Sequence, residues 1–214
     1  MRKIVSVRHG KAVSPEGVTD DSLRVLNDEG INKTRALGDQ LRMLGFVPDR
    51  IIVSGAKRAD QSMRHIMAEI DPGDRLKLVK TMVTVVPGLY KWEELNTAAA
   101  EPEDGGLGFH LHLAVYQDKF PEDLANFEHN RVKALLDALD EPIGDDENVL
   151  IVTHAWISNV SLYPFALKQE LRDELREIGV PEAHALVLHG NGELEAYGPD
   201  GKVEIASLKR VVEA

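Results

Sequence analysis

Residues 1–10 read Met-Arg-Lys-Ile-Val-Ser-Val-Arg-His-Gly, and their apolar positions 4, 5 and 7 predict a short buried β-strand. Arg8 and His9 then lie where the strand gives way to a loop, and open α/β sheets place their chemistry at this carboxyl end. An arginine offers a planar fork of donors for a phosphate or a carboxylate. A histidine can act as a nucleophile or as an acid–base group. Arg8 and His9 are therefore candidate site residues, and Gly10 would allow a sharp turn beside a bound anion.

The same arrangement recurs after two other predicted strands. Residues 51–53 form a short apolar run, and Arg58 follows at the start of a predicted helix. Residues 149–152 form the most clearly buried strand of the chain, which ends at His154. If these strands are parallel neighbours, the Arg8–His9 pair, Arg58 and His154 meet at one edge of the sheet. Two guanidinium groups and two imidazoles around one point suit a tetrahedral dianion.

Predicted strands and helices alternate along the chain, which favours an α/β fold. We expect a mixed, mostly parallel central sheet with helices on both faces, in a single domain over residues 1–214. Residues 96–121, rich in glycine, proline and acidic side chains, are interpreted as an insertion over the sheet edge. A hairpin around Asp200-Gly201 is expected near the C-terminus. Helical periodicity is clearest over 28–45, 58–70 and 122–139.

The composition excludes several classes of partner and chemistry. The formal net charge of −11 argues against nucleic acid or an anionic membrane as a partner, because both require a basic face. The chain has no cysteine, so disulfides and thiolate chemistry are absent. No apolar run approaches the roughly 18 residues of a membrane span, and no secretory signal is visible. We therefore expect a cytoplasmic protein.

Four short motifs together resemble the histidine phosphatase superfamily, which has the phosphoglycerate-mutase-like fold. They are Arg8-His9-Gly10, the pattern from Leu26 to Gly30, Ser54-x-x-x-Arg58-Ala59-x-Gln61-Ser62, and Val152-Thr153-His154. Within the superfamily, Asp21-x-x-Arg24-x-Leu26-Asn27-x-x-Gly30 is most similar to the short phosphohistidine phosphatases. Mutase-type members usually carry an asparagine about five residues after the first motif, where this chain has Ser14-Pro15.

The resemblance implies a role for each of the four basic residues. His9 would be the nucleophile and would form a phosphohistidine intermediate. Arg8 and Arg58 would hold the phosphoryl oxygens, and a protonated His154 would stabilise charge in the transition state. Neither a metal nor another cofactor would be required. A backbone carbonyl or a carboxylate would have to hold the far ring nitrogen of His9.

The general acid remains open at this point. Many members of the superfamily place a glutamate after the third strand, and Glu93 and Glu94 are the candidates here. Both could instead be solvated carboxylates at the start of a helix. His110 and His112 have the alternate spacing of a metal pair on a strand, but the sequence offers no third ligand nearby.

The leading interpretation is a metal-independent phosphatase that acts on a phosphomonoester or on protein phosphohistidine. Its partner would be a phosphorylated small molecule or a phosphohistidine protein. The alternatives are phosphoryl transfer of the phosphoglycerate-mutase type and a non-catalytic module that binds phosphorylated ligands. The first is disfavoured by the missing asparagine, and the second by the intact set of arginines and histidines. The substrate and the oligomeric state are not determined by the sequence.

Overall fold

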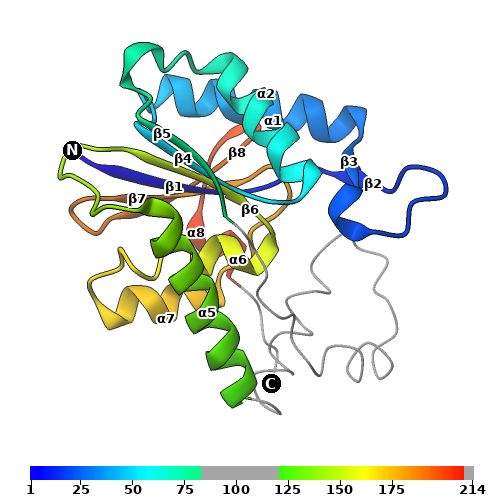
Figure 1. Cartoon of the computed structure of the whole chain (residues 1–214). Helices are drawn as coiled ribbons and strands as arrows, with labels where there is room; N and C mark the ends of the chain where they lie inside the picture. The colour runs from blue at the N-terminus through cyan, green and yellow to red at the C-terminus, as the bar shows by residue number, and fades with distance from the viewer. Residues whose placement is uncertain (83–120, 210–214) are drawn as a thin grey trace.

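The computed structural model of the chain describes residues 1–82 and 121–209 (Figure 1). The predicted insertion at 96–121 therefore lies outside the described residues, apart from its last position. Pro121 opens the helix α5 (Pro121–Leu139).

The centre of the fold is a seven-stranded sheet in the order β5-β4-β6-β1-β7-β8-β9. The strands are β1 (Lys3–Arg8), β4 (Arg50–Ser54), β5 (Leu78–Met82), β6 (Val149–Thr153), β7 (Ala185–His189), β8 (Leu194–Gly198) and β9 (Gly201–Val203). The four strands β5, β4, β6 and β1 run parallel, and β7, β8 and β9 are added by antiparallel pairing. The predicted mixed α/β sheet and C-terminal hairpin are confirmed.

Helices cover both faces of this sheet (Figure 1). One face carries α1 (Asp28–Met43) and α2 (Lys57–Glu69), and the other carries α5, α6 (Ala155–Val160) and α7 (Gln169–Glu177). A short α8 (Ile205–Leu208) follows β9. In the described part of the chain, no helix combines the length and apolar character needed to cross a membrane.

The parallel strands are buried on both sides because alternate side chains enter two different cores. Ile4 of β1 packs in the core under α5, α6 and α7, whereas Val5 and Val7 pack in the core under α1 and α2. Every residue of β4 and β6 is buried. This double burial explains the apolar runs at 51–53 and 149–152, and β6 pairs in parallel with β4 on one side and with β1 on the other.

The chain between the first motif and α1 forms several short elements. Between the first motif and α1 lie a small sheet of β2 (Ala12–Val13) and β3 (Val25–Leu26) and a 3₁₀ turn η1 (Asp21–Leu23). Asp20 caps this turn rather than α1, by accepting from the backbone N–H of Ser22. Asn27 caps α1, because its Oδ1 accepts a 2.8 Å hydrogen bond from the N–H of Gly30.

Candidate active site

The predicted convergence of the three strand ends is present. The order β4-β6-β1 makes these strands parallel neighbours, so their carboxyl ends lie along one edge of the sheet. His9 follows β1 directly, Arg58 is the second residue of α2, and His154 is the N-cap residue of α6. The rings of His9 and His154 lie edge to face with their centroids 5.1 Å apart. Arg8, His9 and Arg58 are all less than a tenth exposed.

Two hydrogen bonds define the protonation of the His9 ring. Nδ1 lies 2.7 Å from the carbonyl oxygen of Gly10, which can only accept, so Nδ1 carries the proton. Nε of Arg58 can only donate, and it lies 3.1 Å from Nε2 of His9, which must therefore accept. The ring is thus neutral, with the lone pair of Nε2 facing the site. Burial, together with the nearby His154 and the two arginines, lowers the pKa of His9 to about 3, although the hydrogen bond to the Gly10 carbonyl raises it.

The loop that carries the Gly10 carbonyl packs closely against α1, and the contact involves Gly10 of the loop and Gly30 of the helix. A Cβ on Gly10 would lie 2.5 Å from Oγ1 of Thr34 and 2.6 Å from the carbonyl oxygen of Gly30, and a Cβ on Gly30 would overlap the backbone of Lys11. The N–H of Gly10 also donates to Oγ of Ser62 on α2, at 3.1 Å. The loop after β1 is therefore packed against α1 and α2 with no room for a side chain at either glycine.

All three nitrogens of the Arg58 guanidinium donate hydrogen bonds. Its Nη2 donates to Oδ2 of Asp21 at 2.7 Å, and its Nη1 donates to the backbone oxygen of the same residue. Although burial raises the pKa of Asp21, the hydrogen bond and charge of Arg58 hold that pKa below its ordinary value. Sequence reasoning placed Asp21 in a motif but missed this contact, because the partners are 37 positions apart.

Arg8 is held from the antiparallel side of the sheet. Its Nη1 donates to the carbonyl oxygen of Val180 at 2.9 Å, and its Nη2 lies 3.9 Å from a carboxylate oxygen of Glu182. Its Nε is buried and has no hydrogen-bond partner among the residues described. One donor of this buried arginine is therefore unpaired within the described residues.

His154 contacts the end of the neighbouring strand. Its Nε2 lies 2.9 Å from Oγ of Ser54, and its Nδ1 is buried without a hydrogen-bond partner within the described residues. Burial, followed by the charge of Arg58, lowers the pKa of His154 to about 3. The lowered pKa favours the neutral imidazole while no anion is bound, whereas the protonated form implied by the resemblance concerns the site with a phosphoryl group in it.

The other candidates lie outside the described residues. Glu93 and Glu94, proposed as general acids, and His110 and His112, considered as metal ligands, all fall between residues 83 and 120. Within residues 1–82 and 121–209, no group of three or more histidine, aspartate or glutamate side chains could hold a metal ion. The arrangement present at the sheet edge, two arginines around two neutral imidazoles, is suited to binding a phosphate and attacking it with a ring nitrogen.

Comparison with solved structures gives the same fold. The ecdysone phosphate phosphatase from Bombix mori has a TM-score of 0.51 and 15% identity, over 89% of this chain and 90% of that one. A candidate phosphohistidine phosphatase SixA from Nakamurella multipartitia has a TM-score of 0.50 and 18% identity, over 92% of this chain and 87% of that one. The product of an open reading frame of Mycobacterium tuberculosis has a TM-score of 0.50 and 16% identity, over 87% and 90%.

Sequence comparison gives one result at the level of the family. No curated protein matches the chain. The family model described as histidine phosphatase superfamily (branch 1) matches residues 4–193. This match spans the first motif, the Arg58 motif and the His154 motif, which are the segments that meet at the sheet edge. The chain therefore belongs to branch 1 of the histidine phosphatase superfamily.

Proposed function

We propose that this protein is a phosphatase that hydrolyses a phosphomonoester or a protein phosphohistidine through a phosphohistidine intermediate on Nε2 of His9. The observation that carries the proposal is the 2.7 Å contact between Nδ1 of His9 and the carbonyl oxygen of Gly10. This contact fixes the tautomer that leaves Nε2 unprotonated. The lowered pKa keeps that atom unprotonated at physiological pH, as a nucleophile must be.

In the first step, the lone pair of Nε2 forms a bond to phosphorus while the bond from phosphorus to the leaving group breaks. The leaving group departs with that electron pair, and the His9 ring gains a positive charge. The Gly10 carbonyl stabilises this positive charge. Its oxygen accepts a hydrogen bond from Nδ1–H, and this bond becomes stronger when the ring is charged. Arg58 must release Nε2 at this stage, and its Nε–H then becomes free to donate to a phosphoryl oxygen.

The remaining basic groups would hold the phosphoryl oxygens. Arg8 contributes the buried Nε that has no hydrogen-bond partner in the part of the chain described. A phosphoryl dianion beside His154 would raise the pKa of that imidazole, since a nearby negative charge favours the protonated form. His154 would then become a cationic donor when the substrate binds, which reconciles its neutral state here with the role that the family resemblance implies.

The second step returns the enzyme to its starting state. Water attacks phosphorus, the bond between phosphorus and Nε2 breaks, and the electron pair returns to the ring. The products are inorganic phosphate and neutral His9. Glu93 or Glu94 would supply the proton that an alkoxide leaving group needs, whereas the imidazole of a phosphohistidine has a pKa of about 6.5 and needs little help.

The experiment is turnover of a ³²P-labelled aryl phosphate, with and without EDTA. We expect phosphate release that EDTA does not change, and acid-labile label on the quenched protein. Label and turnover should vanish in His9→Ala and persist in His129→Ala, which replaces an exposed histidine of α5. Label that persists in His9→Ala would contradict the proposal. Transfer of label to a second phosphate acceptor would indicate a mutase, and vanadate binding without turnover would indicate a binding module.

A further inference from the structure

Ser54 is a buried polar residue at the end of an otherwise apolar strand. The strand β4 alternates between the two cores, since Ile51 and Val53 pack under α1 and α2, whereas Ile52 packs under α5, α6 and α7. By this alternation the side chain of Ser54 lies on the same side of the sheet as Ile52, and the residue is only 2% exposed. A buried hydroxyl is costly unless it forms a hydrogen bond, so its partner indicates why a serine is present here.

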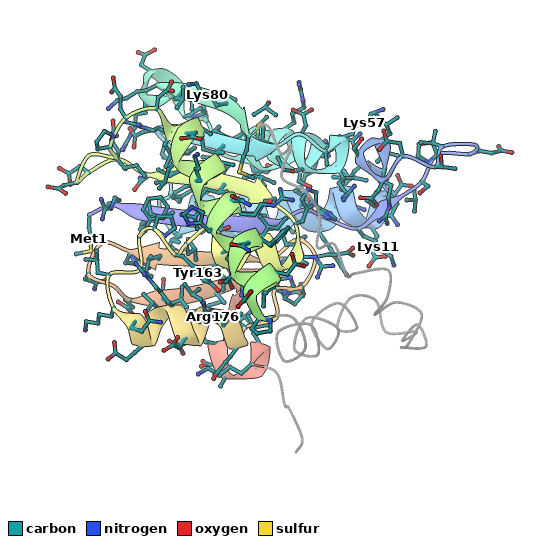
Figure 2. All side chains as sticks on the ribbon, turned by 60° about the horizontal axis from the view of Figure 1, so that its bottom comes forward. Met1, Lys11, Lys57, Lys80, Tyr163 and Arg176 are labelled. Carbon is teal, nitrogen blue, oxygen red and sulfur yellow. The ribbon has the colours of Figure 1, made fainter. Side chains whose placement is uncertain are left out.

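The partner of Ser54 is His154, which follows the neighbouring strand. Because β4 and β6 are parallel neighbours, both end at the same edge of the sheet. Figure 2 shows this edge on the side of the molecule opposite Met1, where Lys11 and Lys57 follow β1 and β4. Oγ of Ser54 lies 2.9 Å from Nε2 of His154, and neither atom has another hydrogen-bond partner in the described residues.

The second ring nitrogen of His154 has no such partner. His154 is the N-cap residue of α6, but its side chain forms no capping hydrogen bond, and Nδ1 is buried and unpaired within the described chain. Nε of Arg8 is buried and unpaired in the same way. Arg8 pairs with Thr153 across β1 and β6, so these two nitrogens belong to residues at adjacent strand ends. A phosphoryl oxygen placed between them would satisfy both.

A hydroxyl group can hold Nε2 of His154 whether the ring is neutral or charged. The Ser54 hydroxyl donates to Nε2 of a neutral ring that carries its proton on Nδ1, and it accepts from Nε2–H of an imidazolium. In both states Nδ1 keeps a proton that it can donate. An alanine would leave Nε2–H of the charged ring unpaired, and a carboxylate would favour the charged ring before any substrate is bound. Serine therefore allows the charge to change while the ring keeps its orientation.

The charges around His154 make its protonation depend on a bound anion. The titratable groups that act on the ring are the neutral His9, the carboxylate of Asp21 and the guanidinium groups of Arg8, Arg58 and Arg131. The arginines lower the pKa of His154, and Asp21 raises it. A phosphoryl dianion would shift this balance towards the imidazolium. The proton can arrive with the substrate, because a phosphate monoester has a second pKa of about 6 and is partly a monoanion near neutral pH.

We propose that Ser54 is a positioning residue for His154, and that its hydroxyl holds Nε2 in both protonation states so that Nδ1–H points at a phosphoryl oxygen. This inference rests on the proposed phosphatase function and extends it beyond the four basic residues. When the substrate binds, the ring gains a proton and the Ser54 hydroxyl changes from donor to acceptor. The imidazolium then stabilises the negative charge on the phosphoryl group. When phosphate leaves with that proton, the ring becomes neutral again.

The first measurement follows the His154 ring by ¹⁵N NMR of histidine-labelled protein, with inorganic phosphate as the probe. The spectrum of His154→Gln assigns the signals of this ring. In the wild type, saturating phosphate should raise the pKa of His154. In Ser54→Ala with saturating phosphate, that pKa should be about one unit lower than in the wild type, a tenfold change in protonation. This is the effect expected when the imidazolium loses one hydrogen bond.

The second measurement follows kcat and KM for an aryl phosphate between pH 6 and pH 8. Ser54→Ala should lose about 10-fold in kcat at pH 8 and less at pH 6, because the imidazolium still forms at the lower pH. The KM should change little, since the arginines that hold the phosphoryl group are intact. Ser54→Thr keeps a hydroxyl and should restore most of the lost rate at pH 8.

The matched control is Ser161→Ala, which removes another buried hydroxyl. In the described structure, Oγ of Ser161 donates to the carbonyl oxygen of Ile157 and forms no hydrogen bond with a site residue. This variant should follow the wild type in both measurements.

Two results would overturn the inference. One is an unchanged pKa of His154 in the phosphate complex of Ser54→Ala, and the other is a ratio of wild-type to Ser54→Ala kcat that does not vary with pH. A wild type that releases no phosphate, and whose His154 signals do not respond to phosphate, would refute the proposed phosphatase itself. With an active wild type, a negative result concerns the role of Ser54 alone.

Discussion

Nε of Arg58 lies 3.1 Å from Nε2 of His9 and donates a hydrogen bond to the atom that we propose attacks phosphorus. The same arginine donates to Asp21 through both terminal nitrogens. The guanidinium is thus oriented by an aspartate at the surface and points at the proposed nucleophile. A phosphoryl group that enters the site can replace His9 as the acceptor for Nε–H without any movement of the Asp21 contact.

This geometry predicts that Arg58→Lys and Arg58→Ala both weaken the binding of phosphate and vanadate. A lysine cannot donate to His9 and Asp21 along two edges at once. We expect Arg58→Ala to lose about 2–5 kcal/mol of binding free energy, as for other desolvated charge contacts. Isothermal titration with vanadate would measure it. Arg64→Lys, at an exposed position of the same helix, is the matched control, and full affinity in Arg58→Lys would show that Arg58 does not touch the anion.

Gly10→Ala should damage both stability and turnover. The added Cβ would meet Oγ1 of Thr34 and the backbone of Gly30, so the loop that carries the Gly10 carbonyl must shift away from His9. We expect a loss of about 1–3 kcal/mol in the free energy of unfolding, typical of overpacking. Urea unfolding would measure this loss, and the aryl phosphate assay would measure turnover.

Gly55→Ala is the control for this prediction, because a Cβ there would meet Thr81 alone among the described residues, at 3.9 Å. It should unfold within about 0.5 kcal/mol of the wild type. Equal stability of the two alanine variants would contradict the packing argument.

His9, which is buried, and His154, which is partly buried, predict a loss of stability in mild acid. Burial, mainly, lowers the pKa values of His9 and His154 to about 3 from an ordinary value of 6.5. Between these values the unfolded chain binds protons that the folded chain does not, so the free energy of unfolding falls as the pH drops below 6.5. The fall at pH 5 should be about 2 kcal/mol for each histidine.

Urea midpoints at pH 7 and pH 5 would measure the effect. The double variant His9→Asn/His154→Gln should show a shallower fall than the wild type, and His129→Gln, at an exposed position, should follow the wild type. Parallel curves for the wild type and the double variant would mean that the two imidazoles are not held neutral by the fold.

The effect of Glu93→Gln and Glu94→Gln on the reaction rate should depend on the leaving group of the substrate. If one of these residues is the general acid, its variant should lose about 10²–10⁴-fold in rate on an alkyl phosphate. The loss should shrink on an aryl phosphate and nearly vanish on a phosphohistidine peptide, because those leaving groups barely need a proton. Single-turnover rates on the three substrates would measure this pattern. A loss of equal size on all three would exclude a role in protonating the leaving group.

The α/β class, the strand ends and the four basic site residues could be predicted from the sequence because each depends on local pattern. Strands buried on both faces are apolar runs, and the residues that follow them must lie at the sheet edge. The glycines of the motifs are also visible in the sequence, but the packing that requires glycine at these positions is not. Gly10 and Gly30 must be glycine because a loop and a helix approach each other there.

Other features depend on residues far apart in the sequence, and only the tertiary structure decided them. The contact of Arg58 with Asp21 and the neutral state of His154 follow from how segments pack and from how much water they exclude. Arg131 looks in the sequence like an ordinary helix cation, and only the structure shows that its Nε is buried without a hydrogen-bond partner in the described residues. The local sequence pattern determines which side chains reach the sheet edge. Their protonation states and hydrogen-bond partners depend on burial by distant segments, which the local pattern does not reveal.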